Sequence, residues 1–183
     1  MVDSQLRPSG VNSRDILERM LAVPREDFVP ADARAFAYMD RAVPLGDGRF
    51  LASAEFHGLM LQEAAPRFAD SALVVDGGSG YLPELLRPMV GTLAVVTPAQ
   101  AARGEGAQGP FSLLLVDGAV EQVPQALAAL LAADGRAITG LLADGVTRLA
   151  AGRRAGAAIA LLPLAELGIP VLADFTRPKA WSF

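Results

Sequence analysis

Hydrophobic residues in the first seventy positions recur with the spacing of a helix. After Ser13, a residue type that often caps helices, apolar side chains recur at i, i+1, i+4 and i+5: Ile16, Leu17, Met20 and Leu21. Two later segments show the same pattern and are also predicted to be helical, residues 30–38 and a segment that begins after Ser53 and ends before Pro66. A cluster of turn-forming residues at 44–48 separates them. Residues 1–70 are therefore expected to form a helical cap.

After Asp70 the pattern changes to short apolar runs that alternate with helical segments. The runs have the length and composition of buried strands and lie at residues 72–76, 92–96, 111–116, 136–142 and 157–162. One helix is predicted after Gly80 and another over 122–131, and the tail at 179–183 is compatible with an edge strand. This alternation favours an α/β fold with a mostly parallel sheet, in which we expect the strand at 72–76 to be central. Residues 71–183 are expected to form this domain, packed with the cap as one structural unit.

The composition narrows the chemistry available to the chain. Its 183 residues (19.1 kDa) include no cysteine and a single histidine, His57. Disulfides, thiol catalysis, cysteine-ligated metal sites and histidine clusters are therefore excluded, and no metal site is expected. His57 lies beside Phe56 on a predicted helix, and we interpret it as a half-exposed surface residue rather than a general base.

The charge balance argues against two kinds of partner. The 16 basic and 20 acidic residues give a net charge of −4 and a pI near 5.0. Sequence-independent binding of nucleic acid needs a dense positive surface, so no nucleic-acid partner is expected. No targeting segment is evident, and no apolar stretch reaches the ~18 residues that a membrane span needs. We therefore expect no membrane partner and a cytoplasmic location.

A glycine-rich turn is the strongest functional signal. It follows a predicted strand, precedes a predicted helix, and comprises Asp76, Gly77, Gly78, Ser79 and Gly80. Such a turn lets a ligand approach the N–H groups at the start of the helix, although a tight turn without a ligand has the same composition. A nicotinamide dinucleotide is disfavoured, because Pro83 occupies the third glycine position of G-x-G-x-x-G. Asp117 ends the third predicted strand, where it could belong to the same ligand site or cap the turn at 118–120.

Four motifs resemble, in order, the protein-L-isoaspartate O-methyltransferase family. The most specific is Val-Pro-Arg-x-x-Phe-Val-Pro at 23–30, and the others lie at 44–49, 78–81 and 115–119. The resemblance spans nearly the whole chain. It implies an α/β fold with the Rossmann-like sheet of S-adenosylmethionine-dependent methyltransferases behind an N-terminal helical cap. It also implies S-adenosylmethionine as the cofactor and a protein substrate that offers a carboxylate.

Several positions depart from the cofactor-binding pattern of that family. Val74 occupies the place of an acid that meets the cofactor's ammonium group, and Asp76 takes the place of the first glycine. Thr97 stands where a second acid binds both ribose hydroxyls, and loss of that acid costs on the order of 2–4 kcal/mol of binding free energy. Asp76 either replaces the missing acid or fills its space. Under the resemblance, the cofactor-binding candidates are Asp76, Gly77, Gly78, Ser79, Gly80, Thr97 and Asp117.

The segment near the substrate differs as well. The family pattern Gly-x-Thr-Ile-Ser-x-Pro corresponds to residues 48–54, where the threonine is replaced by Phe50 and the serine by Ala52. Ser53 lies one position late, so its side chain points elsewhere. The catalytic candidates are Ser53 and Arg49, with Arg49 as a clamp for a carboxylate.

The interval between the second and third strands is short. Residues 98–110 stand where the family has a helix, a strand and a second helix, so the sheet is predicted to be truncated at one edge, with one short helical link. Strand 92–96 would then be an uncharged, apolar edge. Either the link at 98–110 folds back over such an edge or a second copy of the chain covers it. We expect the second, a homodimer through this strand.

Two functions stay open on these observations. The first is S-adenosylmethionine-dependent methyl transfer to a protein carboxylate. The second is a catalytically degenerate methyltransferase fold that serves as a binding or assembly module.

Overall fold

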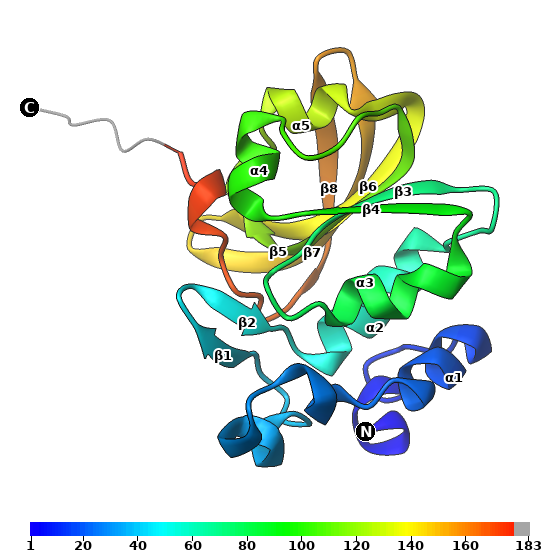
Figure 1. The fold of residues 1–183 in the computed structure, drawn as a ribbon, viewed down its shortest axis with the longest axis vertical. Coiled ribbons are helices and arrows are strands. Elements are labelled where there is room, and N and C mark those ends of the chain that lie inside the picture. Colours follow the sequence, from blue (N-terminus) through cyan, green and yellow to red (C-terminus); the bar gives the residue numbers. More distant parts are fainter. Residues whose placement is uncertain (178–183) are drawn as a thin grey trace, which may run out of the picture.

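A six-stranded sheet lies at the centre of the molecule, in the order β4-β3-β5-β6-β7-β8 (Figure 1). The structure is a computed structural model that describes residues 1–177. Neighbouring strands from β4 to β6 run parallel, whereas β7 and β8 join antiparallel. The strands are β3 (Ser71–Val75), β4 (Thr92–Val96), β5 (Phe111–Val120), β6 (Leu131–Ala143), β7 (Val146–Ala155) and β8 (Ala158–Glu166). The predicted tail strand at 179–183 lies outside the described residues.

β5 pairs with β3, so that residues 113–116 lie beside residues 72–75 in the sheet. β4 is an edge strand, as expected, and residues 97–110, which connect it to β5 along the chain, contain no strand. The expectation that the strand at 72–76 would be central is wrong. β3 lies second from the edge, because β6, β7 and β8 all extend the sheet beyond β5.

Strand β7 has no counterpart among the predicted strands. Gly152 and three arginines interrupt its apolar residues, so it shows neither a continuous apolar run nor a strict alternation. It forms because the chain turns back after β6 at Asp144 and Gly145, whose φ angles are 53° and 76°. An Asp-Gly pair between two strands is a hairpin signal, and this pair could have indicated β7.

The cap is built from short helices and one hairpin. The π-helical turn and 3-10 turns are η1 (Val2–Leu6), η2 (Arg25–Phe28) and η3 (Ala31–Phe36), and the α-helices are α1 (Arg14–Ala22) and α2 (Ala54–Ala64). Ser53 caps α2 as predicted, since its Oγ accepts from the Phe56 N–H at 3.2 Å. The predicted turn at 44–48 belongs to a hairpin of β1 (Val43–Gly46) and β2 (Arg49–Leu51).

The remaining helices cover both faces of the sheet. In Figure 1, α3 (Tyr81–Leu86) lies on the side of α2, and α4 (Pro98–Arg103) and α5 (Gln125–Ala129) lie on the other side. The turns η4 (Arg87–Met89) and η5 (Ala173–Phe175) complete the described helical segments. α4 is the predicted helical link. The helix predicted over 122–131 is shorter than expected, because Leu131 already begins β6.

One hydrophobic core joins the cap to the sheet. It extends without a break from Leu6 in η1 to Phe175 in η5. The division of the chain at residue 70 stays a prediction. In residues 1–177, no helix has the length and apolar character that a membrane crossing needs.

Candidate functional site

The glycine loop connects β3 to α3 at the carboxyl end of the parallel strands. Gly78 and Gly80 have φ angles of 103° and 76°, a conformation that favours glycine. A cavity of about 310 Å³ lies beside the loop, at the lower end of the range for ligand pockets. The cap, the β1–β2 hairpin and the loop all contribute to its lining: Asp27, Phe28, Val29, Pro30, Leu45, Arg49, Gly78 and Ser79.

The Asp76 carboxylate occupies the N–H groups of this loop. Its Oδ2 accepts from Gly78 N at 3.0 Å, and its Oδ1 accepts from Gly80 N at 3.1 Å. Burial, and secondly the nearby Asp117 carboxylate, raise the pKa of Asp76 to about 6. Two of the N–H groups that such a loop would offer to a ligand, those of Gly78 and Gly80, are therefore already bonded to the protein itself.

Strand β2 lies directly against the loop. The Phe50 N–H donates to the Gly77 carbonyl at 3.1 Å, and a Cβ atom placed on Gly77 would lie 2.6 Å from the Phe50 ring. A Cβ on Gly78 would lie 2.5 Å from Cγ of Arg49. Real Cβ atoms do not make such close contacts, so these two positions require glycine. The space beside them is filled by Phe50 and Arg49, whereas a cofactor-binding loop would leave this space to the ligand.

Val74 and Thr97, at the two acidic positions of the cofactor-binding pattern, also have structural roles. Val74 is fully buried and apolar. Thr97 caps α4: its Oγ1 accepts from Gln100 N, and the Gln100 side chain accepts from Thr97 N. The residues around this loop therefore do not fit S-adenosylmethionine, because no carboxylate stands at either of the two acidic positions and the N–H groups of Gly78 and Gly80 are bonded to Asp76.

The interpretation of His57 as a half-exposed surface residue is wrong. Its ring is fully buried, and its Nε2 lies 2.9 Å from Oδ1 of Asp117. α2 directs this ring inward, toward Asp117 in β5. The expectation that Asp117 ends its strand is wrong, because β5 continues to Val120. Its side chain contacts His57 and does not line the cavity, so its place in a ligand site stays a prediction.

The two catalytic candidates, Ser53 and Arg49, differ in their exposure to solvent. Ser53 is buried at the start of α2, and its hydroxyl oxygen is engaged in the cap. Arg49 lines the cavity, with its side chain 55% exposed. The sequence analysis did not identify Arg25, which is fully buried, although it stands in the motif at 23–30. In the described chain, no group of three or more acidic or histidine side chains could hold a metal ion.

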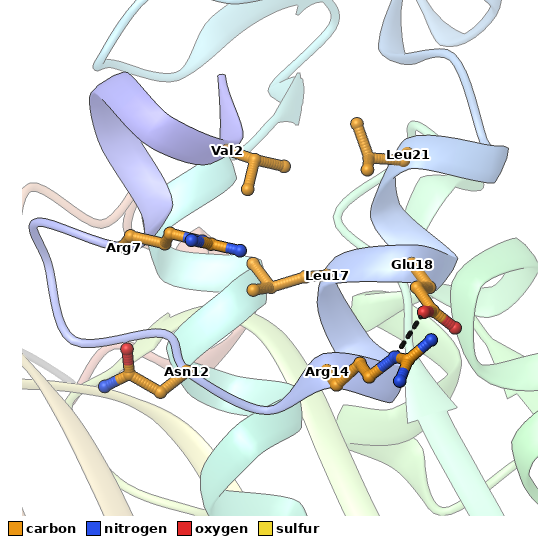
Figure 2. A pocket seen from close by; sticks show the side chains of 7 residues that line it. All are labelled: Val2, Arg7, Asn12, Arg14, Leu17, Glu18 and Leu21. Carbon is orange, nitrogen blue, oxygen red and sulfur yellow. Dashed lines mark hydrogen bonds and ion pairs between the residues drawn. The ribbon is translucent and has the colours of Figure 1, made fainter.

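A second cavity, of about 470 Å³, lies in the cap between η1 and α1 (Figure 2). Its floor includes Leu17, and Arg14 on its rim is paired with Glu18 at 2.6 Å. It shares no lining residue with the cavity beside the glycine loop. It is therefore a separate feature of the cap.

Comparisons with known proteins give the chain's relatives. A family model described as "Protein-L-isoaspartate(D-aspartate) O-methyltransferase" matches residues 1–102. "Protein-L-isoaspartate O-methyltransferase 2" from Anaeromyxobacter sp. (strain Fw109-5) is 32% identical over 162 residues, 75% of this chain and 67% of that protein. "Protein-L-isoaspartate O-methyltransferase" from Gloeobacter violaceus is 34% identical over 163 residues, 75% of this chain and 79% of that protein.

Solved structures share the fold at low sequence identity. A putative protein-L-isoaspartate O-methyltransferase from Plasmodium falciparum, in complex with S-adenosyl-L-homocysteine, superposes with a TM-score of 0.72 at 17% identity, over 92% of this chain and 94% of that one. Another protein-L-isoaspartate O-methyltransferase superposes with a TM-score of 0.73 at 15% identity, over 93% of this chain and 64% of that one. These neighbours confirm the Rossmann-like methyltransferase fold. Together with the family model and the curated relatives, they show that the chain belongs to the protein-L-isoaspartate O-methyltransferase family.

Proposed function

We propose that this chain is a protein-L-isoaspartate O-methyltransferase-like protein in which the fold serves as a binding or assembly module. Its homologues support a methyltransferase-like function that depends on S-adenosylmethionine, with that molecule as the family's cofactor. The residues at this chain's own loop favour a degenerate site. A cytoplasmic location, which the cysteine-free composition supports, is part of the proposal.

One observation supports the degenerate site most directly. The Asp76 carboxylate holds the N–H groups of Gly78 and Gly80, while Phe50 and Arg49 lie against the glycines. A ligand on this loop would have to displace a half-buried carboxylate and an aromatic ring together. Neither Val74 nor Thr97 could compensate that cost with a charged hydrogen bond.

Titration calorimetry with S-adenosylhomocysteine tests the proposal. We expect no binding to the wild type at ligand concentrations up to about 1 mM. If the Asp76 side chain alone blocks the cofactor site, Asp76→Gly should bind S-adenosylhomocysteine. Binding by this variant and not by the wild type would also support the proposal, because it would show that the wild-type loop is blocked. Micromolar binding to the wild type that Asp76→Ala abolishes would instead make Asp76 the replacement for the missing acid, and would overturn the proposal. Asp134→Ala, at an exposed aspartate far along the chain, is the control.

Methyl transfer to a protein carboxylate is the second candidate. The cavity beside the loop favours it, since Arg49 lies there with two weak contacts, to the Asp47 carboxylate at 4.0 Å and to the Leu45 carbonyl, to which its Nη2 donates at 3.4 Å. A guanidinium in this state is free to hold a carboxylate with two hydrogen bonds. Transfer of a labelled methyl group to an isoaspartyl peptide, weakened in Arg49→Lys, would support this candidate. Transfer no faster than without protein would remove it.

We also propose that a second copy of the chain covers strand β4. β4 bonds only to β3, Val95 is 44% exposed, and the helix that follows packs on α5 and η5. An uncharged edge of this kind is a template for strand pairing. Val95→Lys should therefore shift the protein to monomer without loss of fold, while Leu162→Lys on the opposite edge should not. A wild type that sediments as a monomer at high micromolar concentration would refute the dimer.

A further inference from the structure

Three buried side chains connect the cap to the sheet next to the glycine loop. Arg25 in η2, His57 in α2 and Asp117 in β5 are all fully buried. Nη1 of Arg25 lies 3.4 Å from Nδ1 of His57, and Nε2 of His57 lies 2.9 Å from Asp117. Because a guanidinium only donates, these contacts assign the ring proton to Nε2. A neutral imidazole thus joins a cation to an anion.

Arg25 also holds the chain just after β2. Its Nη2 donates to the Ala52 carbonyl at 2.5 Å, and its Nε donates to the Ala37 carbonyl in the cap at 2.8 Å. Its guanidinium lies 4.9 Å from the centre of the Tyr81 ring, at the first residue of α3. Arg25 therefore fixes the position of β2 relative to both the cap and the helix that the glycine loop opens.

The two ends of this connection meet at Gly77. Phe50, two residues before the Ala52 anchor, places its ring on one side of Gly77. The backbone carbonyl of Asp117 is the other close neighbour, at 2.7 Å from the position of a Cβ atom. Gly77 is thus enclosed by a segment that Arg25 anchors and by the residue of β5 that His57 contacts, Asp117.

We propose that Arg25 and His57 are positioning residues for the glycine loop, which they hold closed through Ala52 and Asp117. Stability alone does not account for such a network, because apolar side chains of similar volume often replace buried ion pairs without loss. Its effect is on geometry: it keeps the Phe50 ring and the Asp117 carbonyl against Gly77. The inference goes beyond the proposed function and holds whichever ligand the protein binds.

Amide hydrogen exchange by NMR tests the proposal at Phe50, whose N–H donates to Gly77. Arg25→Met should raise this exchange about 10- to 100-fold, the equivalent of one lost hydrogen bond to a charged group. The amide signals of Gly78 and Gly80 should shift with it. Arg25→Lys, which retains the charge but not the planar fork, should recover part of the protection.

Arg19→Met is the matched control. Arg19 also ties the cap to the sheet domain, through the carbonyls of Glu84 and Leu85 and the Glu84 carboxylate, but touches neither β2 nor the loop. Compared at equal global stability, it should leave the exchange at Phe50 unchanged. Equal effects of Arg25→Met and Arg19→Met would overturn the proposal.

The wild type offers a second measurement if Arg25→Met does not fold. The ring nitrogens of His57 should report the Nε2-protonated tautomer, with a ring proton that exchanges slowly. An Nδ1-protonated ring, or a ring proton in rapid exchange with water, would contradict the connection to Arg25 and overturn the proposal.

Discussion

Strand β3 has an aspartate at each end, and the two carboxyl groups lie in opposite environments. Asp70, just before the strand, accepts from both terminal nitrogens of Arg136, at 2.9 and 2.6 Å, and from the Ser112 hydroxyl. These bonds, the one from Arg136 foremost, hold the pKa of Asp70 at about 2. Asp76, just after the strand, bonds only to backbone N–H groups. Its burial and the neighbouring Asp117 raise its pKa to about 6.

The difference between the two environments indicates that Asp70, before β3, serves stability, whereas Asp76, after β3, lies where a ligand site is expected. Ligands of parallel α/β sheets bind at the carboxyl ends of the strands, and groups with shifted pKa values often mark such sites. The amino end of β3 is closed by a bidentate ion pair. The carboxyl end retains two acidic side chains near each other, which costs stability at neutral pH.

The largest expected effect comes from removing the cation at the amino end. Arg136→Met should lower the free energy of unfolding by about 3–5 kcal/mol, because it leaves Asp70 charged and almost fully buried. Urea unfolding at neutral pH measures this loss. Arg153→Met on β7, whose guanidinium donates only to the Asp134 carbonyl, is the control and should cost less than about 1 kcal/mol. Equal losses in the two variants would contradict the role of the ion pair.

The next effect is the acid sensitivity of the amino end. The pKa of Asp70 is lower in the folded protein than its ordinary 3.8, so its contribution is complete above pH 4 and disappears as the pH falls toward 2. About 2 kcal/mol of unfolding free energy should be lost over this range in the wild type, and not in Asp70→Asn. Unfolding curves of both proteins at several pH values measure the difference. A gap between them that does not change with pH would argue against this assignment.

The carboxyl end should behave with the opposite sign. The pKa of Asp76 is higher in the folded protein than its ordinary 3.8, so its cost is absent below pH 4 and grows as the pH rises through 6. Asp76→Asn should therefore stabilise the protein by about 1–2 kcal/mol at neutral pH and have little effect near pH 4. Thermal unfolding of the two proteins at both pH values decides this, with the exposed Asp134→Asn as the control. A destabilised Asp76→Asn at neutral pH would show that its backbone bonds need the charge.

The smallest effect sharpens the cause of the raised pKa. Asp117→Asn retains an oxygen that can accept from His57 but removes the negative charge near Asp76. The pKa of Asp76 in the folded protein should therefore fall below about 6. Carbon NMR of the Asp76 carboxyl group across a pH titration measures it. An unchanged pKa would assign the whole shift to burial.

Local sequence patterns predicted most of the fold but less of the site. The apolar runs located five of the six strands of the sheet, and Ser53 marked the start of α2, because burial and capping depend on residues close together in the chain. The short interval at 98–110 also predicted that β4 would be an edge. β7 was missed because an antiparallel strand held by hairpins needs no continuous apolar run of its own.

The sequence by itself determined the family, the glycine loop and the loss of the acids at positions 74 and 97, since each is a property of residue type at one place. Only the tertiary structure decided which side chains enclose the loop. Arg25, His57 and Asp117 come from three segments far apart in the chain, and their contacts exist only after the cap packs on the sheet. The environment of a single buried histidine depends on which distant side chains the fold brings to it. No local sequence pattern therefore predicts it.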